Sequence, residues 1–219
     1  MASTGKRALV HSEPNIAHEL GYVGDWLTER GFTVERVFRD NTGEPIHFPD
    51  ADLLINLGSL NSAADGCQLP AAVSEIGAVS EWVDTGRTYI GICYGAQLLA
   101  KALGGTVTRQ PSTERSMASL DLDAPYGPWV RWHEDFITHP GSGTIDSQID
   151  EAIMLFHSGT AWGIQPHLEL TPDTLSRMGI SAHTPPELYE PLVQDLRAQH
   201  ESAKDSTFRL LDYMMGDQQ

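Results

Sequence analysis

Basic residues are scarce in this sequence. Its 219 residues include 14 lysines and arginines but 30 aspartates and glutamates, which gives a formal net charge of −16. A chain this acidic is repelled by nucleic acid and by anionic membrane surfaces, so we expect neither as a partner. We expect the charge to serve solubility, and it does not identify a substrate.

Cysteine is rare as well, and long hydrophobic runs are absent. The two cysteines, Cys67 and Cys93, cannot form a disulfide framework and are typical of a reducing compartment. No run is long enough to span a membrane, and the apolar segment that begins at Ala8 is too short for the core of a signal peptide. The sequence therefore predicts a cytoplasmic protein.

Internal repeats, charge blocks and low-complexity linkers are also missing, which favours one domain over residues 1–219. In the first half, strand patterns (7–10, 32–38, 53–57 and 89–92) alternate with helix patterns (20–27, 70–83 and 96–103). This alternation predicts an α/β fold of three layers, a mostly parallel central sheet with helices on both faces. The second half contains short strand patterns (106–108, 116–122, 129–132, 153–156 and 161–165) and two closing helices (172–178 and 186–215, the latter with a break expected near Ser202).

Cys93 is the strongest candidate for a catalytic residue. It stands between strand 89–92 and helix 96–103, with Gly91 and Gly95 two residues away on either side. This is the nucleophile-elbow pattern, with cysteine where α/β-hydrolases have serine, and it requires small residues because the strand and the helix pass close together. The helix N-terminus favours the thiolate, which is the reactive form. A buried structural cysteine is the alternative, and the two glycines favour the nucleophile.

Nine histidines compete for the role of base, and Glu169 favours His167. In an extended segment the two side chains project to the same side, so the carboxylate can orient the imidazole and stabilise its protonated form. An H-x-E motif alone is weak evidence, and a surface histidine is the ordinary alternative. A zinc site of the deaminase type needs a P-C-x-x-C motif downstream, which this chain lacks, so we expect no metal.

These segments resemble motifs of the class I (triad-type) glutamine amidotransferases. GICYGAQ (91–97) is similar to the family's G-[IV]-C-x-G-x-Q, and WGIQPHLE (162–169) is similar to its G-[VI]-Q-F-H-P-E. WHED (132–135) is similar to a W-H-x-D element of stand-alone members that resemble the GMP synthetase glutaminase domain. The resemblance implies a flavodoxin-like fold, with Cys93 as the nucleophile, His167 as the base and Glu169 as the orienting acid. It also implies hydrolysis of a γ-glutamyl amide through a γ-glutamyl thioester.

Attack by Cys93 on an amide creates an oxyanion that backbone donors must stabilise. We expect two donors, the amide of Tyr94 at the start of the helix and the amide of Ser59 next to Gly58. Ser59 and Leu60 stand where the family has glycine and proline, so this loop is expected to have a different shape.

Three further residues are candidates for substrate binding. Gln97, one helical turn after the nucleophile, either lines the pocket, as its counterpart does in the family, or is a solvated helix residue. Glu114 corresponds to an acid that the family has near its glutamine site. His133 belongs to the WHED element, and both His133 and Asp135 are favoured as structural hydrogen-bonding residues near the site.

Other positions depart from the family pattern. Pro166 and Leu168 replace an aromatic residue and a proline around His167. Because proline cannot donate to a ladder, we expect its strand to lie at an edge or to be bulged. Residues 109–116 are expected to form a loop in which arginine and serine follow the acid. These changes spare the triad but alter its surroundings, so they leave open whether the substrate is glutamine.

Three functions fit these residues. The chain is a glutaminase subunit that passes ammonia to a separate synthase, or a self-contained hydrolase of a larger γ-glutamyl amide, or an inactive binding module. The third is disfavoured because Cys93, His167 and Glu169 are all present. No glycine-rich phosphate loop is found, and we expect no cofactor. The expected partners are a small γ-glutamyl substrate and, for the first function, a synthase subunit.

Overall fold

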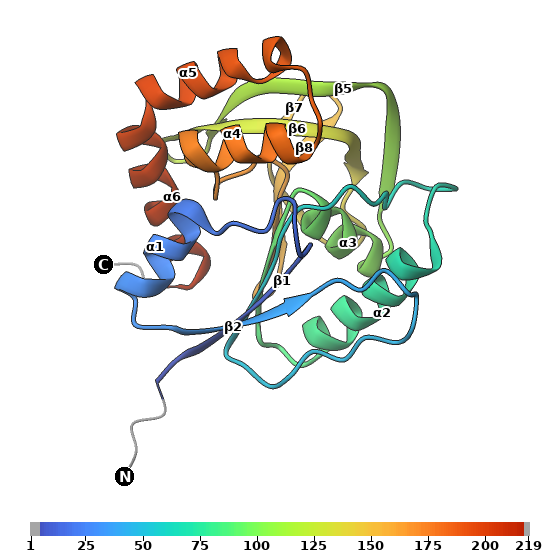
Figure 1. Ribbon diagram of the computed structural model, residues 1–219. Helices are drawn as coiled ribbons and strands as arrows, with labels where there is room; N and C mark the ends of the chain where they lie inside the picture. Colours follow the sequence, from blue (N-terminus) through green and yellow to red (C-terminus); the bar gives the residue numbers. More distant parts are fainter. Residues whose placement is uncertain (1–4, 217–219) are drawn as a thin grey trace.

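In the computed structural model, which describes residues 5–216, a seven-stranded sheet runs through the centre of the molecule (Figure 1). Its strand order is β2-β1-β3-β4-β9-β8-β7. The strands from β2 to β9 are parallel, and β8 and β7 extend the sheet in antiparallel pairs. The strands are β1 (Arg7–Ser12), β2 (Thr33–Phe38), β3 (Leu53–Asn56), β4 (Thr88–Ile92), β7 (Thr144–Ile149), β8 (Ala152–Ser158) and β9 (Ala161–Ile164).

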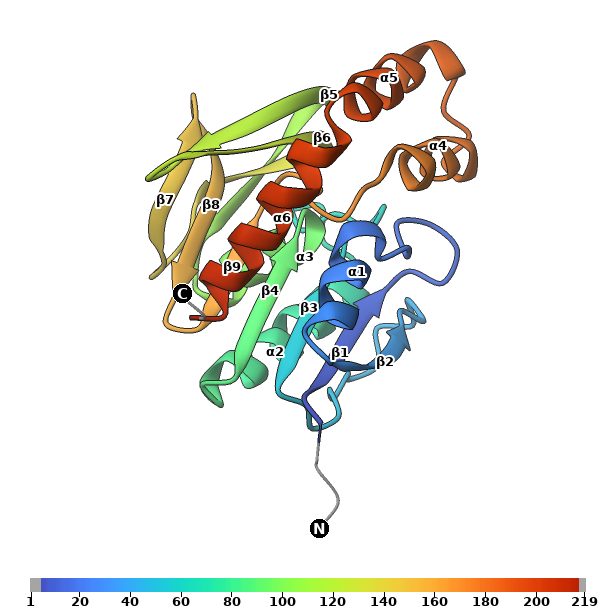
Figure 2. The same ribbon diagram turned by 90° about the vertical axis from the view of Figure 1, so that its left-hand side faces the viewer.

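Helices cover both faces of this sheet. Figure 2 shows α1 (Gly21–Glu29) and α6 (His200–Met214) in front of it, with α2 (Pro70–Asp84) and α3 (Tyr94–Ala102) behind. Alternate residues of β1 enter different cores, Leu9 on the α2–α3 side and Val10 on the α1–α6 side, and both are fully buried. Burial on both faces explains the continuous apolar strands and confirms the predicted three-layer α/β fold. No helix within residues 5–216 has the length and apolar character needed to cross a bilayer.

A long antiparallel ribbon of two strands, β5 (Thr106–Asp121) and β6 (Pro125–His139), forms a second sheet. The prediction of a loop at 109–116 is therefore wrong, because these residues belong to β5. The pairing shifts register between Arg109 and Glu114. This stretch consists of polar residues and one proline, so no apolar alternation marked it as a strand. The pattern at 129–132 is only the middle of β6, and β7 was not predicted.

Three smaller expectations also need correction. The last helical region is divided into η1 (Pro186–Leu188), α5 (Glu190–Ala198) and α6, and the break between α5 and α6 falls at Gln199 instead of near Ser202. Strand β9 ends at Ile164, one residue earlier than expected. It lies between β4 and β8, so the expectation of an edge strand around Pro166 is wrong: the proline follows the strand and breaks no ladder. Helix α4 (Pro172–Ser181) begins at the predicted proline.

Candidate active site

The candidate residues gather where three neighbouring parallel strands end. Cys93 directly follows β4, the Gly58–Ser59 segment follows β3, and His167 lies three residues beyond the end of β9. Both β3 and β9 pair with β4, one on each side. Ligands of open α/β sheets bind at the carboxyl ends of the strands, so this edge is the expected place for a site.

Cys93 occupies the turn between β4 and α3 in a strained conformation. Its φ of 53° and ψ of −108° lie where side chains other than glycine are rare, and its amide donates to the Ile164 carbonyl at 2.8 Å. A Cβ on Gly95 would lie 2.0 Å from the Asn56 carbonyl oxygen, and one on Gly91 would lie 2.4 Å from the Gly95 carbonyl oxygen. Both glycines are therefore required by the close approach of strand and helix, as predicted.

His167 and Glu169 form a buried pair. The His167 Nδ1 lies 2.6 Å from the Glu169 Oε1, and both residues are at most 3% exposed. The expected reason for this pairing was wrong, since residues 165–170 form turns and a single bridge to Val130 instead of an extended strand. The segment is fixed by backbone bonds from His167 to Val130 at 2.8 Å and from Tyr22 to Glu169 at 3.0 Å. Tertiary contacts, and not strand geometry, bring the two side chains together.

The surroundings of His167 favour its protonated form. Burial alone lowers the pKa of His167, but the charge of Glu169, the charge of Cys93 and hydrogen bonds to both raise it more, so that it lies well above 6.5. Because Nδ1 faces Glu169, Nε2 is the nitrogen available to the thiol. The arrangement can hold a proton close to Cys93 and return it to a departing group.

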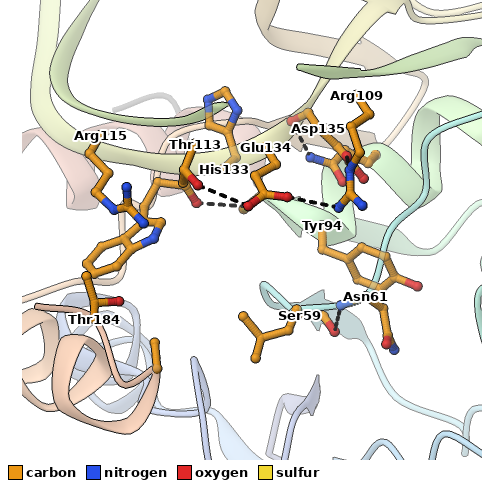
Figure 3. A pocket seen from close by; sticks show the side chains of 15 residues that line it. Ser59, Asn61, Tyr94, Arg109, Thr113, Arg115, His133, Glu134, Asp135 and Thr184 are labelled. Carbon is orange, nitrogen blue, oxygen red and sulfur yellow. Dashed lines mark hydrogen bonds and ion pairs between the residues drawn. The ribbon is translucent and has the colours of Figure 1, made fainter. Parts of the chain in front are cut away.

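Cys93 opens into a cavity of about 260 Å³ (Figure 3). Its walls come from the loop after β3, from the start of α3, from the β5–β6 ribbon and from the end of α4. The lining residues are Ser59, Leu60, Asn61, Cys93, Tyr94, Gln97, Arg109, Thr113, Arg115, Trp132, His133, Glu134, Asp135, Ala182 and Thr184. Positive and negative groups both line the rim, where Arg109 forms ion pairs with Asp135 at 2.9 Å and with Glu134 at 3.2 Å.

Arg39, which the sequence reasoning missed, holds the loop after β3. It is 4% exposed, and its guanidinium donates to the carbonyls of Leu57 at 3.0 Å and Gly58 at 3.1 Å and pairs with Glu75 at 2.9 Å. In a planar trans peptide the carbonyl and the next N–H point in opposite directions. With the Gly58 carbonyl turned toward Arg39, the Ser59 amide is directed away from it. One feature of the sequence could have indicated Arg39. It directly follows the strand pattern at 32–38, and sites form at the carboxyl ends of such strands.

Gly58 lies against the pair of candidate catalytic side chains. A Cβ at this position would come within 3.0 Å of the His167 Cε1 and 3.8 Å of the Cys93 Cβ. The Ser59 hydroxyl bonds to Glu13 at 2.5 Å and accepts from the Asn61 amide at 3.0 Å, which fixes the loop that carries serine in place of the family's glycine. Gly58, Ser59 and Tyr94 therefore lie beside Cys93, where we expected oxyanion donors.

The candidate substrate-binding residues are placed differently from one another. Gln97 is 2% exposed, lines the cavity and donates to the Asp135 carbonyl at 2.9 Å, so it is not a solvated helix residue. His133 also lines the cavity; burial first, and then the charges of His167 and Arg131, lower its pKa to about 4. Its ring nitrogens have no hydrogen-bond partner of good geometry among the described residues.

Glu114 is not among the residues that line the cavity. It pairs with Arg131 across the ribbon at 2.9 Å, and its neighbours Thr113 and Arg115 reach the cavity instead. Of the two residues expected to make structural hydrogen bonds, Asp135 does so, because it accepts from Ser62 at 2.5 Å and from Arg109. For His133 this expectation is wrong, since neither ring nitrogen has a hydrogen-bond partner of good geometry among the described residues. Within residues 5–216 no group of three or more His, Cys, Asp or Glu side chains is arranged to hold a metal ion.

Comparison with known proteins gives consistent matches. A family model described as glutamine amidotransferase class-I matches residues 26–178. The glutamine amidotransferase-like protein YfeJ of Salmonella typhimurium is 25% identical over 182 residues, 74% of this chain and 75% of that protein. The glutamine-hydrolysing GMP synthase of Thermus thermophilus is 32% identical over 114 residues, 46% of this chain but 20% of the synthase, so this chain resembles about a fifth of that enzyme.

A solved structure extends the likeness over nearly the whole chain. A glutamine amidotransferase from Thermotoga maritima superposes with a TM-score of 0.79 and covers 95% of this chain and 97% of its own, at 22% identity. At this level of identity the match concerns the fold alone.

Proposed function

The chain belongs to the class-I glutamine amidotransferase family, and on that premise we propose that it hydrolyses the γ-amide of a γ-glutamyl compound through a thioester on Cys93. One observation carries the proposal: Cys93, in a strained conformation, and the buried His167–Glu169 pair lie at the carboxyl ends of neighbouring strands, and Cys93 and His167 line the same hollow. Strain at a non-glycine residue and a charge-coupled histidine are typical of catalytic groups. Because the nucleophile is a thiol that must stay reduced, we propose the cytoplasm as its compartment.

The first half of the proposed reaction forms the thioester. The Cys93 sulfur attacks the amide carbon, a C–S bond forms, and the carbonyl oxygen becomes an oxyanion. The amides of Tyr94 and Ser59 donate to this oxygen, and Arg39 keeps the Ser59 amide in place through the Gly58 carbonyl. The His167 Nε2 then gives its proton to the departing nitrogen as the C–N bond breaks. Ammonia or an amine leaves.

The second half releases glutamate. Neutral His167 takes a proton from water, the oxygen attacks the thioester carbon, and the C–S bond breaks to return the thiolate. Glu169 holds the Nδ1 proton in both halves and stabilises the imidazolium when it forms. No cofactor is needed for this chemistry.

The glutamyl group fits the large cavity. Its zwitterionic end carries both signs of charge, and Arg115 and Glu134 supply both at the wall. Gln97 and His133 line the same cavity as Cys93, so in this proposal they contact the glutamyl chain. Glu114 acts indirectly, because its ion pair with Arg131 holds the ribbon that carries the wall.

Transfer of ammonia to a synthase is the second candidate. It is supported by the likeness to a glutamine-hydrolysing GMP synthase, of which this chain resembles only a part. A chain with this role would hydrolyse glutamine slowly until a synthase docks. A self-contained hydrolase would turn over γ-glutamyl amides without a partner.

Turnover assays on the purified chain test the proposal. Release of ammonia from glutamine and of amine from γ-glutamyl alkylamides is measured for the native chain, for Cys93→Ala and for Cys67→Ala. We expect the native chain and Cys67→Ala to turn over at least one substrate and Cys93→Ala to lose about 10⁴-fold or more of kcat. A Cys93→Ala protein with native turnover would contradict the mechanism. A glutaminase rate that rises on addition of a synthase would favour the second candidate.

A further inference from the structure

A second, smaller hollow also opens at Cys93, and it extends toward His167. Its volume is about 50 Å³, and it shares Ser59, Leu60, Cys93, Trp132 and Ala182 with the large cavity. Four residues line the small hollow but not the large cavity, namely Ile16, Ala17, His167 and Met178. The large cavity instead continues along Gln97 and the ribbon. Two spaces therefore diverge from the nucleophile.

The walls of the small hollow are mostly apolar. Ile16 and Ala17 come from the loop between β1 and α1, and Met178 from α4. Leu60, Trp132 and Ala182 complete the apolar part. Polar atoms come from Ser59, Cys93 and His167, and the described residues that line the hollow include no Asp, Glu, Lys or Arg. The large cavity, in contrast, is bordered by two arginines and two acidic residues. The two spaces therefore suit different chemical groups.

The position of His167 decides which part of a substrate each space receives. If His167 gives its proton to the departing nitrogen, that nitrogen lies next to the imidazole when the C–N bond breaks. A substituent on the nitrogen then extends into the hollow that His167 lines, while the charged glutamyl end occupies the large cavity. Ammonia has no substituent and would leave the apolar walls without contacts.

We propose that the preferred substrates are γ-glutamyl amides of short-chain apolar primary amines. The inference rests on the proposed function, because it uses His167 as the proton donor. A water molecule needs about 10–15 Å³ of cavity volume, so the hollow has room for roughly three to five heavy atoms. That corresponds to an alkyl group of about two to four carbons. Against the side chains of Ile16, Ala17 and Met178, a hydroxyl or a charged group would lose hydration without gaining a side-chain partner.

The substrate series that tests this consists of glutamine and the γ-glutamyl methyl-, ethyl-, n-propyl- and n-hexylamides. The ethanolamide serves as a polar match for the propylamide. We expect kcat/KM to rise with each carbon up to propyl, to about 60-fold above glutamine, because each of the three buried carbons is worth about fourfold. The ethanolamide should fall back toward glutamine. Glutamine or the ethanolamide as the best substrate would overturn the inference but leave the proposed function intact, whereas no Cys93-dependent turnover of any member would overturn both.

Two variants that fill the hollow test its location. In Met178→Trp and in Ala17→Leu, the ratio of the propylamide kcat/KM to that of glutamine should fall at least about tenfold as the alkyl group loses its space. Ile180→Phe is the matched control, because Ile180 lies on the same helix as Met178 but is 62% exposed, and its ratio should stay native. Met178 is in the core, so the melting temperature is measured for each variant. An unchanged ratio in either folded variant that fills the hollow would contradict the assignment.

Discussion

In the proposed mechanism, His167 and Glu169 have unequal roles. The imidazole exchanges protons with the reacting groups, whereas the carboxylate only orients the imidazole and stabilises its charged form. Removal of the imidazole should therefore cost more than removal of the carboxylate's charge.

We predict that His167→Ala lowers kcat by about 10⁴-fold or more, whereas Glu169→Gln lowers kcat by only about 10²-fold. Glu169→Gln should also move the alkaline limb of the pH–rate profile to lower pH, because the charge of Glu169 is what raises the pKa of His167 against the effect of burial. Steady-state kinetics across pH measure both effects.

His157→Ala is the control for this comparison, since His157 pairs with Asp146 at 2.8 Å, away from the cavity lining. A His167→Ala enzyme that works at the native rate would show that another histidine is the base. His133 would then be the first alternative, because it lines the cavity.

Residues with a motif could be identified from the sequence, and residues that act through tertiary contacts could not. Cys93, His167 and Glu169 were marked by their local pattern. Arg39 was not, because β1 separates its strand from β3, whose following loop it binds. Glu114 was chosen by position along the chain, but the register shift in β5 places its neighbours at the cavity instead.

The turn between β4 and α3 is the element on which the site depends. Its two glycines allow α3 to pass close to β3 and β4, so a methyl group added at Gly95 meets the backbone of Asn56. A backbone oxygen cannot rotate away as a flexible side chain can, so the helix itself would have to move.

We predict that Gly95→Ala destabilises the fold by about 3 kcal/mol. Gly77→Ala is the matched control: Gly77 lies on the exposed face of α2, a Cβ there meets nothing within 4 Å, and the change should stabilise the helix by about 0.5–1 kcal/mol. Urea denaturation compares the two. Equal stability of both variants would show that strand and helix are less closely packed than described.

At the level of elements, the first half of the chain was predictable and the second half less so. Strands β1, β3 and β4 are buried on both faces, so their apolar runs stand out in the sequence. In the ribbon of β5 and β6, most residues of β5 are exposed or half-buried, so β5 has no run of apolar residues that would mark it as a strand. Its polar residues border the cavity, so the part that escaped prediction is also a part that shapes the candidate site.

For the molecule as a whole, buried histidines make stability depend on pH. Burial first, and the charge of Arg39 second, lower the pKa of His11 to about 3, and burial lowers that of His133 to about 4. Unfolding returns both to ordinary values near 6.5. Below pH 6.5 the unfolded chain thus binds more protons than the folded one, and the free energy of unfolding falls as the pH falls. The raised pKa of His167 opposes this fall only near pH 6.5, where the unfolded imidazole is half protonated, and has no effect near pH 5, where His167 is protonated in both states.

We predict that the free energy of unfolding decreases between pH 6.5 and pH 5 by up to about 1.4 kcal/mol per pH unit for each of these two histidines. His11→Gln should reduce this slope by about one proton, whereas His47→Gln should not change it, because the His47 side chain is 76% exposed. Urea denaturation at several pH values measures the slope. A native slope in folded His11→Gln would contradict the account.

Selective alkylation tests the proposal that Cys93 is the nucleophile for a γ-glutamyl group. Cys67 is exposed and Cys93 is buried, so accessibility alone would favour Cys67. The chain is treated with a chloroketone analogue of glutamine or, separately, with iodoacetamide, and the labelled thiols are identified by peptide mass spectrometry. We predict that iodoacetamide reacts readily at Cys67, while the glutamine analogue labels Cys93 far faster than Cys67 and is slowed by glutamate. Equal labelling of the two thiols by the glutamine analogue would contradict the claim.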